Sequence, residues 1–293
     1  MVVIIILLLL LTGFFTTKLV YDTVFRRTSD GYDISDIGYD RTDLCFMSNE
    51  NELCAYLYDG ADKGLIVIAP GFTSSAKDYL AQTEYFLEHG YGVFLFDVTG
   101  SGNSGGSSEI GFAQEANDLS AGLDYINSKD NFGYDRIFLF GHSRGGYAVC
   151  TQLYRNDISG AVSISGINSS MEAVMSGAAD AVGDIAYGNY PMLWIYQSML
   201  FGSKSINQTA CDMIDDSSVP TLIVQGENDD KAPIDEYSIY SHKNEIDSPN
   251  VEYYICTSPG MDGHTDLLYD KNGSANPVLM DKVTDFYDSI IGG

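Results

Sequence analysis

The stretch from Arg136 to Gly146, RIFLFGHSRGG, decides the fold. The apolar run from Ile137 to Phe140 is typical of a buried strand, and glycines border Ser143 in the pattern Gly-x-Ser-x-Gly. A strand that ends in such a tight turn and leads directly into a helix places its serine at the carboxyl end of a parallel sheet. Because the chain has 30 glycines in 293 residues, this pattern gains its meaning from the sequence around it.

Short apolar runs alternate with helical stretches from residue 43 onward. We expect a hairpin at 44–58 and buried strands at 65–69, 91–97, 136–140, 161–165, 221–226 and 251–256. We expect helices at 76–89, 112–128 and 145–155, between the last two strands, and at about 275–291. Strands that are apolar on both faces and alternate with helices predict an α/β fold, with a doubly wound, mostly parallel sheet.

Residues 167–218 interrupt this rhythm, because they contain small and aromatic side chains and no strand-like run. They predict a small helical lid at about 167–218, inserted into a single domain that spans residues 43–293.

The first residues form a separate segment. Residues 1–17 carry no charge, and as a helix they would span about 25 Å, slightly less than a hydrocarbon core of about 30 Å. No basic stretch precedes this run and no small-x-small cleavage motif follows it. Residues 1–21 therefore predict a single-pass, membrane-spanning helix, followed by a linker at 22–42. A cleaved signal peptide and a buried N-terminal helix are the alternatives.

The side of the membrane that the domain occupies stays open. Lys18, Arg26 and Arg27 follow the span, which favours a cytoplasmic domain. Cys45 and Cys54 favour the opposite side, because the predicted hairpin would place them opposite each other, and a disulfide there would indicate an oxidising compartment. Two small buried apolar side chains are the other interpretation of this pair, and the one that we favour.

Composition and charge exclude several kinds of partner. The net charge of −26 repels phosphate backbones, so we expect no nucleic-acid partner. We favour a solvated acidic surface as the explanation of this charge, and a site for cationic substrates is the alternative. The run from Gly100 to Gly105 matches Gly-x-Gly-x-x-Gly, but no helix opens at its third glycine and the next strand ends without a carboxylate. We interpret it as a structural turn, and expect neither cofactor nor metal.

The four histidines offer one suitable general base. A nucleophilic Ser143 needs an imidazole that accepts its proton, and in a doubly wound hydrolase the chain order is serine, acid, histidine. His89 and His142 precede the serine, and His242 falls within an expected helix. His264 lies in a glycine-rich loop directly after a strand, so we expect it to be the base.

The remaining groups follow from the same geometry. The acid that orients the base should follow the strand at 221–226, where Glu227, Asp229 and Asp230 stand; we favour Asp229, with Asp230 second. A solvated loop carboxylate is the alternative for any one of them. The oxyanion hole requires two backbone donors, and we expect the N–H groups of Phe72 and Arg144 to supply them.

These motifs resemble those of α/β-hydrolase-fold serine hydrolases, in the group of serine aminopeptidase-like, lysophospholipase-like and monoacylglycerol-lipase-like enzymes. The resemblance covers about residues 43–291 and rests on Pro70–Phe72, the glycine turn at 97–105, Gly141–Gly145, Gly226–Asp229 and Gly263–His264. It implies a structural role for Asp97. The chain departs from the family pattern where Pro70 replaces the usual histidine of the oxyanion loop and where Thr99 replaces an arginine.

We therefore expect a membrane-anchored serine hydrolase that cleaves acyl or lipid-like esters through an acyl-enzyme on Ser143. Its substrate is expected to be a small-molecule ester, a lipid or a short peptide. An aminopeptidase of the same fold is an alternative, in which Glu172, Asp180 and Asp184 of the lid would bind the free amine. A non-catalytic scaffold is a third. The substrate and the oligomeric state are not determined by the sequence.

Overall fold

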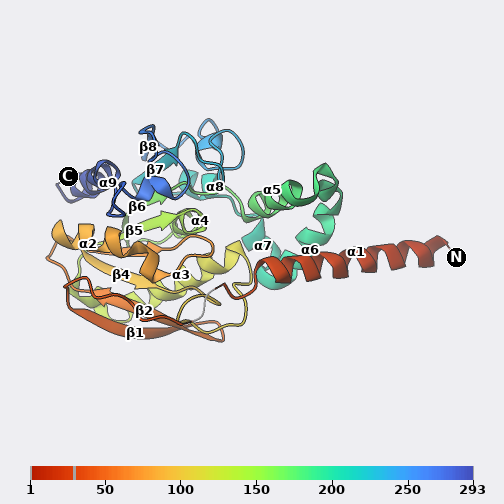
Figure 1. Cartoon of the computed structure of the whole chain (residues 1–293), viewed down its shortest axis with the longest axis horizontal. Helices are drawn as coiled ribbons and strands as arrows, with labels where there is room; N and C mark the ends of the chain where they lie inside the picture. Colours follow the sequence, from red (N-terminus) through yellow and green to blue (C-terminus); the bar gives the residue numbers. More distant parts are fainter. Residues whose placement is uncertain (1, 29–30, 293) are drawn as a thin grey trace.

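An eight-stranded sheet forms the centre of the computed structural model, which describes residues 2–28 and 31–292 (Figure 1). The strands are β1 (Arg41–Ser48), β2 (Asn51–Tyr58), β3 (Leu65–Ala69), β4 (Gly92–Phe96), β5 (Ile137–His142), β6 (Ile158–Ile164), β7 (Thr221–Gly226) and β8 (Val251–Cys256). Their spatial order is β1-β2-β4-β3-β5-β6-β7-β8. The β1/β2 and β2/β4 pairs are antiparallel and the other pairs are parallel, which confirms the predicted mostly parallel sheet.

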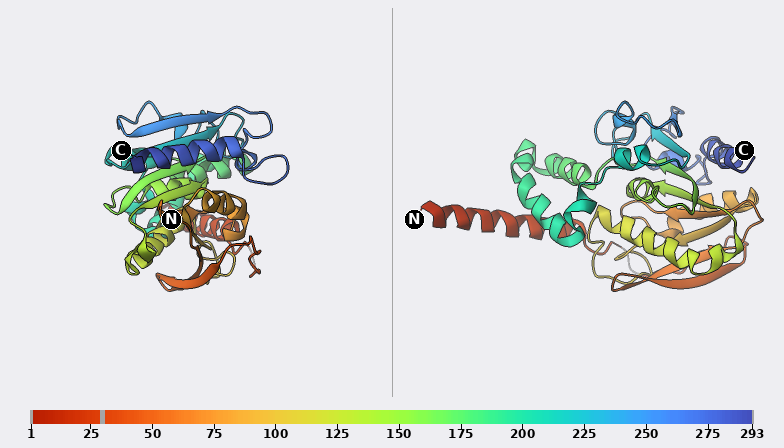
Figure 2. Two further views of the ribbon diagram at one scale, coloured as in Figure 1. Left: turned by 90° about the vertical axis from the view of Figure 1, so that its left-hand side faces the viewer. Right: turned by 180° about the vertical axis from the view of Figure 1, so that it is seen from behind.

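Helices cover both faces of the sheet (Figure 2). One face carries α2 (Leu80–Glu88) and α9 (Pro277–Gly292), and the other carries α3 (Phe112–Asn127), α4 (Arg144–Cys150) and α8 (Ala210–Asp215). The central strand β5 shows why its sequence is apolar throughout. Its side chains point alternately to the two faces, so Leu139 joins one core and Phe140 the other.

Two expected helices differ from the structure. The helix predicted at 145–155 ends at Cys150. The helix predicted between β7 and β8 is absent from this described segment, which contains only the short 3-10 turn η4 (Tyr240–His242). The backbone N–H groups of Lys231 and Ala232 instead donate to the Asp229 side chain, so they are used by a loop rather than by a helix. Outside the stretch 167–218, the other 3-10 turns of the described residues are η1 (Ala76–Tyr79), η2 (Asp130–Gly133) and η5 (Asp266–Leu268).

The hairpin β1–β2 places Cys45 directly opposite Cys54, as the sequence predicted. Both are free thiols in this structure. Cys45 is exposed, whereas Cys54 is half-buried and its Sγ lies 3.1 Å from the carbonyl oxygen of Asn103. The hairpin therefore forms without a disulfide.

The stretch predicted as a lid is helical. Its elements are α5 (Ser170–Val182), η3 (Asp184–Asn189), α6 (Tyr190–Phe201), α7 (Ser203–Ile206) and α8. These elements follow β6 and precede β7. Helices α5 and α6 lie beside the N-terminal helix α1 (Val2–Val24), at the same end of the domain (Figure 1).

Helix α1 projects away from the domain (Figure 2). Residues Val3–Val24 have a mean hydropathy of 2.4, and by length and composition this helix is able to cross a membrane. The described side chains of its first three turns are exposed. Its last turn is different, because Tyr21 is buried and packs edge to face against Tyr196 of α6 at a ring-centroid distance of 5.3 Å. The helix therefore has a free end and an end docked on the lid.

The segment after α1, expected to be a linker, also contacts the domain. Phe25 is buried, and the Arg27 guanidinium donates to the carbonyl oxygens of Gly102, Ser104 and Gly106 at 2.7–2.9 Å. The glycine turn is thus a structural element that fixes the path of the N-terminal segment.

Candidate active site

Ser143 lies in a sharp turn between β5 and α4. Its backbone φ of 57° and ψ of −117° place it in a strained conformation for a residue with a side chain. The turn is tight because both flanking glycines touch backbone: a Cβ on Gly141 would lie 2.2 Å from the Gly145 oxygen, and one on Gly145 would lie 2.1 Å from the Ala69 oxygen. The Gly-x-Ser-x-Gly pattern is therefore required by packing, and it presents the serine hydroxyl at the end of the sheet.

Three predicted site residues meet at this point. The Nε2 atom of His264 lies 2.9 Å from the Ser143 Oγ, and its Nδ1 lies 2.9 Å from both carboxylate oxygens of Asp229. With Nδ1–H donating to the carboxylate, Nε2 is free to accept from the serine hydroxyl. These side chains come from the loops that follow β5, β7 and β8, the carboxyl ends of parallel strands.

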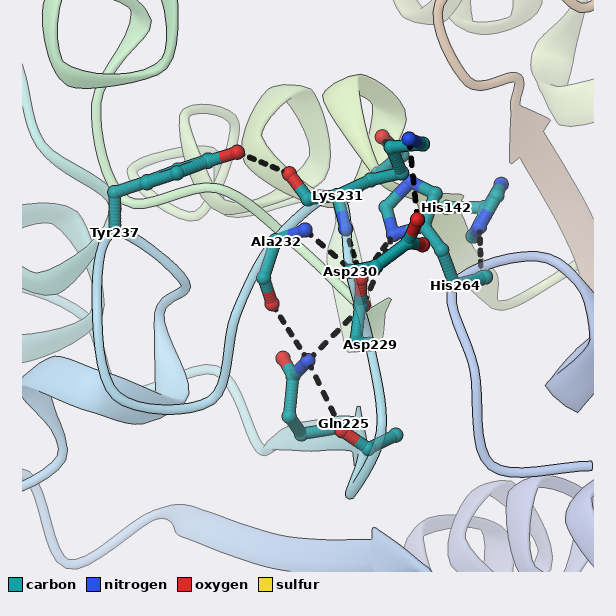
Figure 3. A network of polar contacts seen from close by, with 10 residues as sticks. His142, Gln225, Asp229, Asp230, Lys231, Ala232, Tyr237 and His264 are labelled. Carbon is teal, nitrogen blue, oxygen red and sulfur yellow. Dashed lines mark hydrogen bonds and ion pairs between the residues drawn. The ribbon is translucent and has the colours of Figure 1, made fainter. Parts of the chain in front are cut away.

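The Asp229 carboxylate is held from several directions (Figure 3). It accepts the backbone N–H groups of Lys231 and Ala232 at 2.9 and 2.8 Å, and the Gln225 side-chain amide at 3.0 Å. Burial raises the pKa of Asp229, but the hydrogen bond and charge of His264 and the Ala232 N–H outweigh it, so this pKa lies below its usual range. The carboxylate stays ionised and fixes the imidazole in one orientation.

The structure separates the two acids that the sequence left open. Asp230 points to solvent, with its side chain 72% exposed and paired with Lys231 at 3.1 Å. Asp229 is buried and contacts His264. The polar Gln225, next to the apolar run Leu222–Val224 of β7, is the sequence signal for an oriented carboxylate at this strand end.

Two of the other histidines lie elsewhere. The Nδ1 atom of His242 is 3.1 Å from Glu245, and that of His89 is 2.7 Å from the carbonyl oxygen of Tyr85. Within residues 2–28 and 31–292, no group of three or more His, Cys, Asp or Glu side chains is arranged to hold a metal ion.

His142 connects the loops of the site. Its Nε2 lies 2.8 Å from the carbonyl oxygen of His264, which can only accept, so this nitrogen carries the proton. Its Nδ1 therefore accepts from the Tyr79 hydroxyl at 3.0 Å, and that hydroxyl accepts the Gly71 N–H at 2.8 Å. Burial has the largest effect on the pKa of His142 and the charge of His264 the next largest; together they lower this pKa to about 3, so the His142 ring is neutral. Sequence order excluded His142 as a base but did not reveal this link.

The two expected oxyanion donors lie on segments that border Ser143. Arg144 is the first residue of α4, where a backbone N–H has no partner within the helix. In the described part of the chain, the Phe72 N–H makes no hydrogen bond. The preceding Gly71 lies against the turn that carries Ser143, because a Cβ on Gly71 would be 3.1 Å from the His142 ring.

The Arg144 side chain supports the same loop from inside the protein. It is buried and forms ion pairs with Glu109 and Glu115, whose carboxylates are also buried. Its guanidinium carbon lies 5.4 Å from the centroid of the Phe72 ring, and Nη2 is 3.4 Å from the Gly71 oxygen. Burial raises the pKa of Glu115, while the charge of Arg144 opposes that change. Nothing in the sequence pattern indicated this cluster.

The three lid acids of the aminopeptidase hypothesis do not share one site. Glu172 lines a second cavity of about 620 Å³ with a mixed polar and apolar lining, together with Glu236 and His242. Burial raises the pKa of Glu172. Asp180 lies about 12 Å further along the same helix. Asp180 and Asp184 are exposed and do not line this cavity.

Solved structures share this fold. The esterase Pf2001 of Pyrococcus furiosus superimposes with a TM-score of 0.67 at 20% identity, over 90% of this chain and 96% of that one. The α/β hydrolase GrgF of Penicillium sp. sh18 superimposes with a TM-score of 0.64 at 16% sequence identity, over 87% of this chain and 100% of that one. Est1E of Butyrivibrio proteoclasticus, solved with ferulic acid bound, superimposes with a TM-score of 0.62 at 20% sequence identity, over 85% of this chain and 100% of that one.

A search of curated protein sequences finds no significant match. The family model for serine aminopeptidase, S33, matches residues 60–216, which is more than half of the chain and includes Phe72, Ser143 and Arg144. The protein is therefore a serine hydrolase and belongs to the serine aminopeptidase S33 family, within the α/β-hydrolase fold.

Proposed function

We propose that the protein is an esterase that cleaves carboxylic esters through an acyl-enzyme on Ser143, with His264 as general base and Asp229 as the orienting acid. The observation that carries this proposal is the unbroken chain of 2.9 Å contacts from the serine hydroxyl through the imidazole to a buried carboxylate. A non-catalytic scaffold of this fold would have no need to keep all three groups aligned.

The reaction follows from these positions. Ser143 Oγ attacks the ester carbon while its proton passes to His264 Nε2. The negative oxygen of the tetrahedral intermediate accepts hydrogen bonds from the N–H groups of Phe72 and Arg144. The C–O bond to the leaving alcohol then breaks, and His264 returns the proton to that alcohol. A water molecule repeats the sequence on the acyl-enzyme and releases the carboxylic acid.

An ester is favoured over a peptide because the cavity beside Phe72 is apolar, with Phe25, Phe112 and Leu193 among its lining residues. Of the three lid acids, the aminopeptidase alternative keeps only Glu172, which lines the second cavity beside Glu236. Burial raises the pKa of Glu172, which makes its carboxyl group a weaker partner for a free amine.

The exposed apolar helix supports attachment to a membrane. In this proposal residues 1–21 anchor the chain, residues 22–42 join the anchor to the domain, and residues 43–293 form the hydrolase with its lid at 167–218. The side of the membrane is testable by protease accessibility of the domain in intact cells. Extraction of the full chain from membranes by carbonate alone would contradict the anchor.

The test of activity compares p-nitrophenyl butyrate with leucine p-nitroanilide as substrates of the full chain in detergent. We expect hydrolysis of the ester, and loss of at least about 10⁴-fold in kcat for both Ser143→Ala and His264→Ala. His242→Ala is the matched control and should leave kcat unchanged. Faster cleavage of the anilide would favour the peptidase, and a Ser143→Ala variant as active as the wild type would overturn the assignment.

A further inference from the structure

An apolar cavity of about 480 Å³ lies between helix α1 and lid helix α5. Its volume falls within the range of small-molecule sites, which is about 300–1,000 Å³. One wall is the last part of α1, from Thr16 to Val24, and the opposite wall runs along α5 from Ala173 to Val182. A helix able to cross a membrane is thus also part of the wall of a cavity.

The cavity has an exposed rim and an inner end that is lined by aromatic rings. Val20, Val182 and Ile185 at the rim are each more than half exposed. At the inner end Phe72 and Phe112 pack edge to face, with ring centroids 5.3 Å apart. Because Phe72 is the expected oxyanion residue, the cavity leads from the surface of the protein to the loop beside Ser143.

Two of the few polar side chains in the cavity lining, Asn189 and Thr17, bind each other. The Asn189 amide donates to the Thr17 hydroxyl at 2.5 Å, and that hydroxyl donates to the Gly13 carbonyl oxygen at 2.8 Å. They leave little to recognise a polar ligand, whereas the other lining residues are nearly all apolar. The expected occupant is therefore a hydrocarbon chain.

The surface around the rim is apolar as well. The lid carries exposed hydrophobic side chains on η3 and α6, among them Ile185, Tyr187 and Met199. Helices α5 and α6 lie at the end of the domain from which α1 projects (Figure 1). A large apolar surface of this kind is typical of contact with a membrane or a partner. Its continuity with the exposed half of α1 favours a lipid surface.

We propose that this cavity binds the acyl chain of a lipid ester that enters from a membrane surface, and that α1 is one wall of the substrate site. The inference rests on the proposed esterase function, and it names the substrate class: an ester with one long acyl chain. The chain lies between α1 and α5, and its carbonyl group reaches the Ser143 hydroxyl past Phe72.

Gly177 allows the cavity to be filled without disturbing the fold. It lies on α5 and lines the cavity, and a Cβ there would have no atom within 4 Å. The variant Gly177→Leu should lower kcat/KM for p-nitrophenyl palmitate about tenfold or more, while p-nitrophenyl butyrate stays within twofold. Gly188→Leu is the matched control, because Gly188 is equally open but lies outside the cavity lining. Equal effects of Gly177→Leu on both esters, or none on either, would overturn the proposal.

The contribution of α1 is tested separately with Val20→Trp, which should reduce palmitate hydrolysis selectively. Leu19→Trp, at an exposed position outside the cavity lining, is its control. If Gly177→Leu acts on the long ester but Val20→Trp behaves like Leu19→Trp, α1 is not a wall of the site and that part of the proposal is wrong. If the wild-type protein cleaves neither ester, the proposed esterase function itself has failed.

Discussion

Arg144→Met removes the single cation from a buried cluster and leaves the carboxylates of Glu109 and Glu115 without their partner. Breaking a buried ion pair in this way costs about 3–5 kcal/mol in the free energy of unfolding. Arg155 is a matched control because it also pairs with two acids, Asp124 and Asp157, but Asp124 is 69% exposed. The Arg155 side chain is itself only 11% exposed, but both of its acids keep contact with water, so Arg155→Met should cost less in the free energy of unfolding than Arg144→Met.

Urea unfolding of the full chain in detergent, followed by circular dichroism, measures both values. Replacing Glu109 and Glu115 by Gln in the Arg144→Met background should recover part of the loss, because the uncompensated charges are then gone. A loss no larger than that of Arg155→Met would refute the reasoning.

The same variant should affect catalysis, since the Arg144 side chain contacts the loop that carries Phe72. Without it the oxyanion donor is less well fixed, and we expect kcat for p-nitrophenyl butyrate to fall about tenfold or more while KM changes less. Arg155→Met should leave kcat unchanged. A normal kcat in a folded Arg144→Met variant would show that the oxyanion loop is held by other contacts.

Two further predictions follow from the hydrogen bonds around the site. The folded-state pKa of Asp229 lies below the unfolded value of about 3.9, so its stabilising contribution is present above that pH and is lost as the pH falls through the folded pKa. The free energy of unfolding should therefore fall more steeply between pH 5 and pH 3 in the wild type than in Asp229→Asn, and equal slopes would contradict this. Tyr79→Phe leaves the buried Gly71 N–H and His142 ring without their partner and should cost about 1–3 kcal/mol and lower kcat. Tyr287→Phe also deletes a buried hydroxyl contact, but it should lower stability alone, and a similar loss of kcat in both variants would exclude a specific role for Tyr79.

Much of the fold was predictable because it depends on local patterns. Strands that are buried on both faces, such as β5, leave a continuous apolar run, and the glycines around Ser143 mark a turn in which a side chain would clash with backbone. The hairpin register that pairs Cys45 with Cys54 follows from the same kind of local reasoning. The order of Ser143, Asp229 and His264 along the chain, and their places after strands, likewise follow from the topology.

The rest depends on contacts between distant residues. The link from Gly71 through Tyr79 and His142 to His264 joins the segment after β3, the end of β5 and the loop after β8, and none of its members carries a distinctive spacing. Arg27 belongs to a polar segment that resembles a linker, yet its guanidinium fits three carbonyl oxygens of the glycine turn. Such partners become visible only when the fold has brought them together.

The most direct test of the site is covalent labelling of the full chain with a fluorophosphonate, followed by mass spectrometry of the modified peptide. The reagent requires an activated serine, so the geometry predicts one adduct, on Ser143, that is lost in Ser143→Ala and strongly slowed in His264→Ala. His242→Ala should be labelled at the wild-type rate. An adduct on another residue, or no adduct on a folded wild-type protein, would contradict the assignment of Ser143 as the nucleophile.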